Sequence, residues 1–221
     1  MRRSDGIAVP SSFTMIAQNR GMGGLVQAMS GGSRLQAWRN KSLAVAIYEQ
    51  GSVVGLTDAP APFGFRYDEV SRFAHQLVKQ YVNQSYRGTT TTCWVWLNDG
   101  RSHRFQCQST PRHRNVVEDL RQFVDPRIAA AQLPVMFAAL RQGQSVPFGE
   151  YVLGPHGLTT GTGRKQKHLL WAEVEAVAVE HGFVKVTERG RRRTWAAPST
   201  AAVPNLTAFL TLVREARGGG A

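Results

Sequence analysis

The stretch FRYDEVSRFAHQLVKQYV, residues 65–82, and the stretch LLWAEVEAVAVEHGFVKV, residues 169–186, follow one pattern. In each, apolar residues lead to an aromatic residue, then to an acid and a valine, and then to a second extended run. Gly51 and Gly157, each preceded by an apolar pair, extend the match toward the N-terminus. Self-similarity in this order predicts one structural unit that is present twice, and a chance match between β-rich segments is the alternative.

Length and composition allow such a duplication. The chain has 221 residues, of which 42% are hydrophobic, so it can bury the core of one large domain or of two smaller ones. Its 27 Lys and Arg residues outnumber its 15 Asp and Glu residues, which gives a formal net charge of +12. This excess favours polyanionic partners such as nucleic acid, anionic lipid or acidic protein surfaces. A basic surface that binds no specific partner is the alternative.

Both cysteines lie in the segment CWVWLNDGRSHRFQC, whose alternation predicts a β-hairpin. The Asp-Gly pair at 99–100 suits a two-residue type I′ turn. That register pairs Trp96 with His103 and places Cys93 on the opposite sheet face from His103 and Cys107. The sequence therefore predicts no disulfide and no zinc site here, and no C-x-x-C motif indicates a metal site elsewhere.

The sequence carries no clear targeting or membrane signal. No apolar run of the length found in signal peptides follows Arg2 and Arg3, and no run of about 18 apolar residues predicts a transmembrane helix. Two unpaired cysteines are typical of a reducing compartment. The sequence predicts a cytoplasmic protein, with a peripheral position at the membrane as the alternative.

Composition and pattern divide the chain into four segments. Residues 1–35 are rich in Gly and Ser and have no sustained hydrophobic period, which predicts a flexible leader. We expect a first domain over 36–143, a second domain over 144–217 and a flexible tail over 218–221.

The first domain is expected to begin with strands. LAVAIYEQGSVVGL, residues 43–56, predicts two short strands. The run from Val70 fits a helix and a strand equally well by its period, and we favour a long strand because the β-branched run after it needs a neighbour to pair with. The segment YRGT, residues 86–89, is the expected turn between these two strands.

Helices are expected to complete the first domain. Residues 111–124 have one apolar helical face, and a second helix is predicted from Asp125 to Gly143, with a kink or break expected at Pro134. The second domain repeats the order, with short strands over 146–161, three more over 168–198 and a final amphipathic helix that begins at Pro204.

Several segments occur in one order over residues 38–215: IYEQG, FRYDEV, LNDGR, AQLPVMFAALRQGQSVPFG, GLTTG, LLWAEVEAV, GFVKV and VPNLTAFLTLV. By these segments the chain resembles an uncharacterised bacterial family of tandem pleckstrin-homology-like (PH-like) proteins. The resemblance implies a mostly β fold with helices (α+β), in which two tandem PH-like barrels are each a strongly bent antiparallel sheet capped by a C-terminal helix. It implies no activity, cofactor or catalytic residue, because a fold alone does not define a function.

The repeated aromatic and acidic residues are the first candidates for a site. Tyr67 with Glu69, and Trp171 with Glu173, have the residue types of a catalytic pair. A structural role is the favoured interpretation, because an aromatic residue at a strand start usually packs in a core and an acid beside it is usually solvated.

The glycine-rich basic segment GTGRKQKH, residues 161–168, is the first candidate for anion or lipid binding. It does not have the spacing of a Walker loop. PH domains that bind phosphoinositides use basic residues in a loop of this kind, so Arg164, Lys165, Lys167 and His168 could hold a phosphate or an anionic headgroup. A plain solvated loop is the competing interpretation.

The densest positive run, ERGRRRTW, is the candidate for nucleic-acid binding. A turn here brings together Arg189, Arg191, Arg192 and Arg193 beside Trp195, and such a patch suits phosphate contacts. The sequence shows neither interleaved aromatic residues for base stacking nor a helix aimed at a groove.

Together these observations predict a non-enzymatic binding or scaffold module without a cofactor. A protein partner, bound at an exposed strand edge or helix-edge groove, is the favoured prediction. An anionic membrane or phosphate ligand at 164–168 is the first alternative, and nucleic acid at 189–193 is the second.

Overall fold

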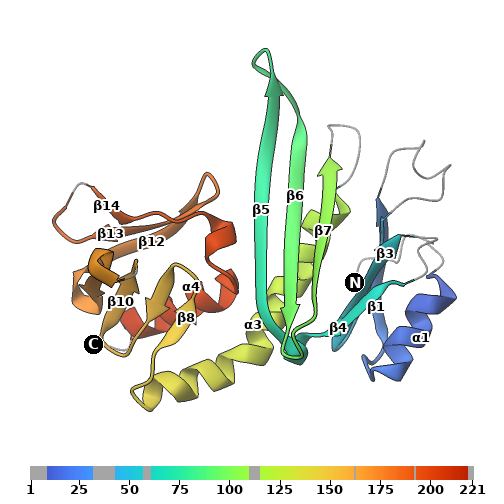
Figure 1. Ribbon diagram of the computed structural model, residues 1–221, viewed down its shortest axis with the longest axis horizontal. Helices are drawn as coiled ribbons and strands as arrows, with labels where there is room; N and C mark the ends of the chain where they lie inside the picture. Colours follow the sequence, from blue (N-terminus) through green and yellow to red (C-terminus); the bar gives the residue numbers. More distant parts are fainter. Residues whose placement is uncertain are drawn as a thin grey trace. The chain divides into compact units, whose positions relative to one another are not determined.

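The computed structural model describes residues 9–31, 43–56, 61–109, 115–161, 163–191 and 193–218. In these ranges the protein is mostly β, with three α-helices and four separate antiparallel sheets, none of which closes into a barrel (Figure 1). The sequence predicts two strongly bent sheets, one in each domain. The described strands instead form four sheets, two in each part of the chain.

The N-terminal part of the chain contains the first pair of sheets. After helix α1 (Ser11–Asn19), the first sheet has the strand order β1 (Leu25–Gly31), β2 (Leu43–Tyr48), β3 (Gly51–Leu56) and β4 (Phe63–Arg66). The 3-10 turn η1 (Tyr67–Glu69) leads to a second sheet of β5 (Val70–Val82), β6 (Ser85–Leu97) and β7 (Ser102–Ser109), and helix α3 (Val116–Arg141) follows.

The C-terminal part has the same order of elements. Its four-stranded sheet contains β8 (Val146–Phe148), β9 (Tyr151–Leu153), β10 (Gly157–Thr160) and β11 (Lys167–Leu170), with the 3-10 turn η2 (Gly163–Lys165) before β11. The 3-10 turn η3 (Trp171–Glu173) leads to a sheet of β12 (Val174–Glu180), β13 (Phe183–Glu188) and β14 (Thr194–Ala196). The 3-10 turn η4 (Thr200–Ala202) and helix α4 (Leu206–Gly218) follow.

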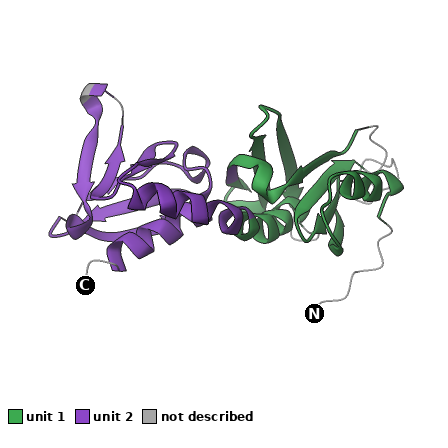
Figure 2. Ribbon diagram, turned by 90° about the horizontal axis from the view of Figure 1, so that it is seen from below, with its two compact units in different colours: residues 1–72, 77–127 green, residues 73–76, 128–221 purple. Residues whose placement is uncertain are grey.

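The chain divides into two compact units, coloured separately in Figure 2. Unit 1 comprises residues 1–72 and 77–127, and unit 2 comprises residues 73–76 and 128–221. The division therefore falls inside α3, whereas the sequence predicts a boundary after residue 143. A short piece of β5 belongs to unit 2.

The predicted flexible leader is wrong for residues 9–31, which form α1 and β1. Phe13 and Ala17 of α1 are 1% and 3% exposed, and they pack with Ala46 and Val53 on one face of the first sheet. The small side chains on that face let a nine-residue helix approach closely, so burial and not intrinsic helix propensity holds it in place. The remaining residues of the predicted leader lie outside the described residues.

Helix α3 is one continuous helix of 26 residues, where the sequence predicts two. Pro126 and Pro134 both lie inside it, although an interior proline removes a backbone hydrogen bond. Apolar residues anchor the helix on both sides of Pro126, because Val124 and Ile128 are 0% and 1% exposed. Packing therefore outweighs the local cost of the prolines.

The predicted register of the cysteine-containing hairpin is wrong by one residue. The Gly100 N–H donates to the Leu97 carbonyl at 3.1 Å, and the Leu97 N–H donates to the Arg101 carbonyl at 2.8 Å. Gly100 has φ +86° and Asp99 does not have a positive φ, so the loop has three residues instead of the two of a type I′ turn. Trp96 consequently pairs with Ser102 and not with His103.

This shift changes which side chains share a face. Cys93 pairs with Phe105, and Thr91 pairs with Cys107. Because side chains alternate along a strand, Cys93, His103 and Cys107 lie on the same face and not on opposite faces as predicted. Both cysteines are free thiols, and among the described residues no three His, Cys, Asp or Glu side chains form a group that could hold a metal ion.

The long strand predicted from Val70 is confirmed as β5, which has 13 residues. Its turn lies earlier than predicted. Asn83 and Gln84 have φ values of 47° and 63°, so they form the two-residue turn to β6, and residues 86–89 belong to that strand.

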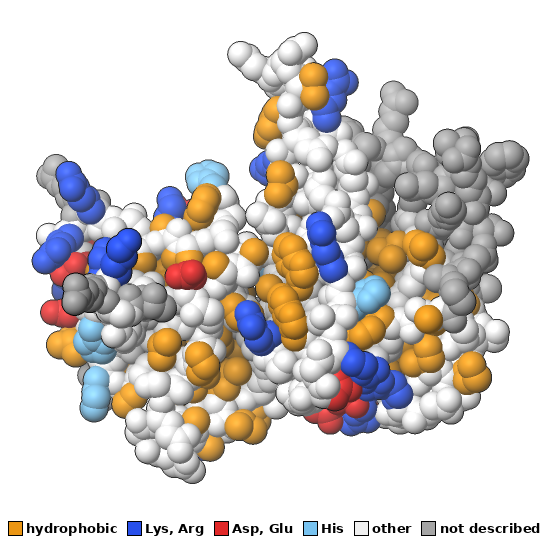
Figure 3. Space-filling model, in the orientation of Figure 1, with side chains coloured by type: hydrophobic (Ala, Val, Ile, Leu, Met, Phe, Trp, Pro, Cys, Tyr) orange, Lys and Arg blue, Asp and Glu red, His pale blue; other side chains and the backbone are white. Residues whose placement is uncertain are grey.

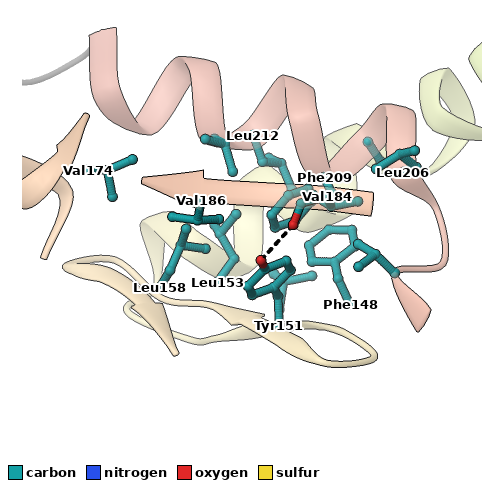
Figure 4. Packing of buried hydrophobic residues seen from close by; sticks show 14 of the residues in the cluster. Phe148, Tyr151, Leu153, Leu158, Val174, Val184, Val186, Leu206, Phe209 and Leu212 are labelled. Carbon is teal, nitrogen blue, oxygen red and sulfur yellow. Dashed lines mark hydrogen bonds between the residues drawn. The ribbon is translucent and has the colours of Figure 1, made fainter. Parts of the chain in front are cut away.

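Unit 2 has its own core, to which both of its sheets and α4 contribute (Figure 4). Tyr151 and Phe209 stack at a centroid distance of 5.3 Å with an interplanar angle of 8°, and the Tyr151 hydroxyl donates to the Val184 carbonyl at 3.0 Å. Burial raises the pKa of Tyr151. The predicted C-terminal amphipathic helix is confirmed, because Leu206, Phe209 and other residues of α4 are buried in this core.

Candidate functional site

The repeated acids close the two 3-10 turns. The Glu69 carboxylate accepts a hydrogen bond from the Arg66 N–H at 3.0 Å, and the Glu173 carboxylate accepts one from the Leu170 N–H at 3.0 Å. Each acid thus satisfies a backbone donor at the start of its turn. These contacts give both acids a structural role at equivalent places in the two parts of the chain.

The aromatic residues of the same turns are also held by backbone carbonyls. The Tyr67 hydroxyl lies 3.1 Å from the Tyr48 carbonyl and 2.9 Å from the Gly51 carbonyl. The Trp171 indole N–H donates to the Gly154 carbonyl at 3.2 Å. Burial raises the pKa of Tyr67, which keeps its hydroxyl protonated as a donor.

Two of the predicted anion-binding residues line a pocket. Lys165 and Lys167 lie beside Glu150 and Trp195 around a pocket of about 520 Å³ in unit 2. The ring of Trp195 is nearly parallel to that of Tyr151, with the ring centroids 6.4 Å apart, and this stacking gives the pocket a rigid wall. No ion pair of either lysine is seen within the described part of the chain. The pocket thus offers two cations together with one acid.

The other residues of this predicted site do not join that pocket. The His168 ring lies on β11 opposite Thr159, and its Nδ1 is 3.1 Å from the Thr159 hydroxyl. The side chain of Arg164 lies outside the described part of the chain. The structure therefore brings together two of the four predicted residues.

The arginine-rich turn is partly neutralised. The Arg191 guanidinium forms an ion pair with Glu188 at 3.0 Å, although its side chain is 72% exposed. Arg189 and Arg193 are exposed, and Arg192 lies outside the described residues. The described part of this turn therefore presents charge to solvent.

A groove that the sequence did not single out lies between β12 and α4. It has a volume of about 560 Å³. Its walls are the apolar side chains of Val177, Val179, Leu210 and Val213, and its rim carries Arg214 and Arg217.

Strand β12 is an edge strand, because its sheet has the order β12-β13-β14. Glu180 and Phe183 flank the two-residue turn to β13 and form a hydrogen-bonded pair, so the backbone groups of Val177 and Val179 point away from β13. No hydrogen bond to these outward groups is seen among the described residues. At Glu175, the outward carbonyl accepts a hydrogen bond from Arg217 of α4 at 2.7 Å.

The corresponding edge positions of β5 are occupied. Phe73 and His75 lie three and five residues after Val70, as Val177 and Val179 lie after Val174. These β5 residues belong to unit 2, where they meet the segment before α4.

Asn205 holds both backbone groups of Phe73. The Phe73 N–H donates to the Asn205 side chain at 2.8 Å, and the Asn205 N–H donates to the Phe73 carbonyl at 2.7 Å. The Thr200 hydroxyl donates to the His75 carbonyl at 3.2 Å. The chain itself therefore covers this strand edge with an irregular segment, and the matching edge of β12 stays open.

Sequence reasoning missed the groove because it combines a strand with a helix about 30 residues later, and no local pattern encodes that contact. One signal of the groove was present in the sequence of the C-terminal helix. Leu210 lies on the apolar side of the predicted C-terminal helix, yet it is only partly buried, so the helix has a wider apolar face than the core uses.

Helix α3 is the one described helix that is long and apolar enough to cross a membrane by length and composition. Its residues Val116, Leu120, Val124 and Ile128 are 0–1% exposed within the protein. Over the apolar 18-residue window of this helix, 22% of the residues are buried inside the protein.

Comparison with known proteins places the chain in a family. A family model described as "Family of unknown function (DUF6585)" matches residues 32–219. No curated protein matches the chain. Because the family model covers most of its length, the protein belongs to this family of unknown function, DUF6585.

Proposed function

We propose that the protein is a non-enzymatic binding module composed of two tandem PH-like domains. What supports this architecture is the order of four strands, a 3-10 turn, three strands and a helix, which occurs twice along the chain. The equivalent hydrogen bonds of Glu69 and Glu173 support it further. PH-like folds serve many functions, so the groove indicates the function of this protein and the fold alone does not.

The proposed partner is a protein that supplies an extended segment to the β12 edge. The observation that carries this proposal is the open strand edge at Val177 and Val179. At the matching positions of β5, backbone groups of Phe73 and His75 are hydrogen-bonded to the segment before α4. An unpaired strand edge is a template for another strand, and main-chain hydrogen bonds supply affinity in this mode of recognition.

The groove also indicates the chemistry of that segment. One row of its side chains would face the apolar walls formed by Val179 and Leu210, so alternate positions are expected to be apolar. Arg214 and Arg217 at the rim favour acidic residues at the end of the segment near them. A segment with alternating apolar residues and a terminal acidic cluster is therefore the proposed ligand.

Selection from a library of random peptides tests the proposal. Val179→Pro removes an outward N–H that β13 does not use and obstructs strand addition, while Val179→Thr keeps the β-branched shape and the N–H. Peptides selected on the wild-type protein are expected to bind V179P roughly tenfold more weakly and V179T nearly as well. Selected peptides that bind V179P as tightly as the wild type, or a selection that yields no common pattern, would contradict the proposal.

A second candidate function is the binding of a phosphate group in the pocket beside Lys165 and Lys167. The specific observation in its favour is that both lysines face one pocket without an ion pair among the described residues. Glu150 in the same pocket opposes an anion. Calorimetric titration with inositol phosphates tests this candidate, and Lys165→Gln with Lys167→Gln is expected to abolish any heat of binding that the wild type shows.

A further inference from the structure

The β5–β6 hairpin extends beyond its sheet as a two-stranded ribbon. Strand β7 pairs with β6 only from Thr89 to Trp96, so among the described strands no third one lies beside the residues before Thr89 (Figure 1). We call residues 77–88 the ribbon tip. The matching hairpin of β12 and β13 has no such extension, because β5 has 13 residues where β12 has seven.

Large hydrophobic side chains are exposed on the ribbon tip. Five of them are 40–58% exposed: Leu77, Val78, Tyr81, Val82 and Tyr86. Figure 3 shows such side chains and basic side chains together on the projecting hairpin. A two-stranded hairpin is only marginally stable in water by itself, and exposed apolar clusters mark interaction sites.

These hydrophobic residues lie on both faces of the ribbon. Tyr81 and Tyr86 form an edge-to-face contact with ring centroids 5.8 Å apart, so they share one face. By alternation along the strand, Val78 and Val82 lie on the other face. A protein groove covers one face of a ribbon, whereas immersion in a lipid interface surrounds both. The distribution therefore favours a lipid surface.

The charge of the hairpin points to an anionic surface. No Asp or Glu occurs between Glu69 and Asp99. Lys79 and Arg87 flank the exposed tyrosines, which is the combination of basic and amphipathic aromatic residues found at the membrane–water interface.

We propose that the ribbon tip is an interfacial anchor that immerses in the headgroup layer of an anionic lipid bilayer. The polar turn residues Asn83 and Gln84 restrict it to that layer, because hydrocarbon offers them no hydrogen-bond partner. The ribbon tip shares no residue with the β12–α4 groove, and the proposal does not depend on peptide binding there.

Co-sedimentation with vesicles tests the anchor. The probe is phosphatidylcholine vesicles with and without phosphatidylserine. The wild type is expected to pellet with phosphatidylserine-containing vesicles only. Lys79→Gln with Arg87→Gln is expected to weaken partitioning about fivefold per charge. Tyr81→Ser, Val82→Ser and Tyr86→Ser combined are expected to weaken it roughly tenfold or more.

Two control variants distinguish the ribbon tip from exposed apolar and basic residues elsewhere on the protein. Val135→Ser removes a hydrophobic side chain that is 72% exposed on α3, and it is expected to leave partitioning unchanged. Arg141→Gln removes an exposed positive charge from the same helix and is also expected to leave it nearly unchanged. The apolar substitutions are at exposed positions, and circular dichroism of each variant checks that the fold is retained.

A second measurement does not depend on those substitutions. Tyr81→Trp is expected to show more fluorescence quenching by brominated lipid than the wild type. The proposal is overturned when the wild type fails to pellet with phosphatidylserine vesicles. It is also overturned when Lys165→Gln with Lys167→Gln, at the competing anion site, loses partitioning and the ribbon variants keep it, or when the tryptophan at position 81 gains no quenching.

Discussion

Asn205 is the residue on which the covered edge of β5 depends, and its replacement tests that role. It is 5% exposed and has φ 55°, a left-handed conformation that Asn and Gly tolerate better than other residues. Its side chain accepts from the N–H of Phe73, which is itself 1% exposed. The residue therefore contributes both a hydrogen bond and a backbone conformation.

Three substitutions separate these contributions. Asn205→Gly leaves the buried Phe73 N–H without its acceptor, which costs about 1–3 kcal/mol of unfolding free energy. Asn205→Ala loses the same acceptor and, unlike glycine, keeps a Cβ in the left-handed region, which costs about 1–2 kcal/mol more than glycine at this position. Asn205→Asp keeps an acceptor and a short side chain, so the smallest loss is expected for it.

The assay combines urea denaturation with hydrogen exchange. The free energy of unfolding is expected to fall in the order wild type, N205D, N205G and N205A. Exchange of the Phe73 amide, followed by NMR, is expected to accelerate in N205G and N205A. If N205A lies within about 0.5 kcal/mol of the wild type, or if the Phe73 amide stays equally protected in both variants, the role assigned to Asn205 is wrong.

Three further predictions concern buried groups. Gly157→Ala would place a Cβ 2.2 Å from the Leu169 carbonyl oxygen, so we expect a loss of about 2 kcal/mol or more of unfolding free energy by urea titration; an unchanged midpoint would disprove the close approach. Burial raises the pKa of Tyr67, so its contribution to stability is complete below the ordinary tyrosine pKa and is lost as the pH rises through the raised folded pKa. Thermal melts across that alkaline range are expected to show a smaller decline for Tyr67→Phe than for the wild type, and equal declines would argue against it. Burial raises the pKa of both thiols, but Cys93 is 0% exposed and Cys107 is only half-buried, so Cys107 is expected to react first with a thiol reagent. Faster labelling of Cys93 in the folded protein would contradict its burial.

Local pattern was sufficient for the elements whose neighbours lie close in the chain. The long strand β5 fits a helix and a strand equally by period, and the β-branched run that follows it correctly indicated a strand pair. The apolar face of α4 was visible in its spacing. The sequence interpretation expected Glu69 and Glu173 to be solvated, whereas each carboxylate accepts a hydrogen bond from a backbone N–H.

The local sequence pattern did not predict the conformation of the turn at Asp99 and Gly100. Asp99 and Gly100 suit a two-residue turn, but the chain uses a three-residue loop, and the one-residue shift moves Cys93 onto the face of His103. Side chains alternate at every residue, so the smallest error in a turn reverses every assignment of faces in the hairpin. The backbone conformation of Asp99, which does not have a positive φ, decided the register of the hairpin.

The candidate site depended on contacts across long separations. Lys165 and Lys167 were found from the sequence because they are neighbours in a charged loop. The groove was not, since Val179 and Leu210 come from different elements and neither is unusual in its own segment. The exposure of the ribbon tip also needed the structure, because the same alternation would describe a buried strand.

The sequence by itself determined the periodicities, the excess of positive charge and the twofold order of aromatic, acid and valine, because these are properties of neighbouring residues. Only the tertiary structure decided which strand edges stay open. Whether the backbone of Val177 or Phe73 finds a hydrogen-bond partner depends on where a distant segment such as Thr200–Asn205 packs. That choice is made by the burial of the whole chain, which local pattern does not contain.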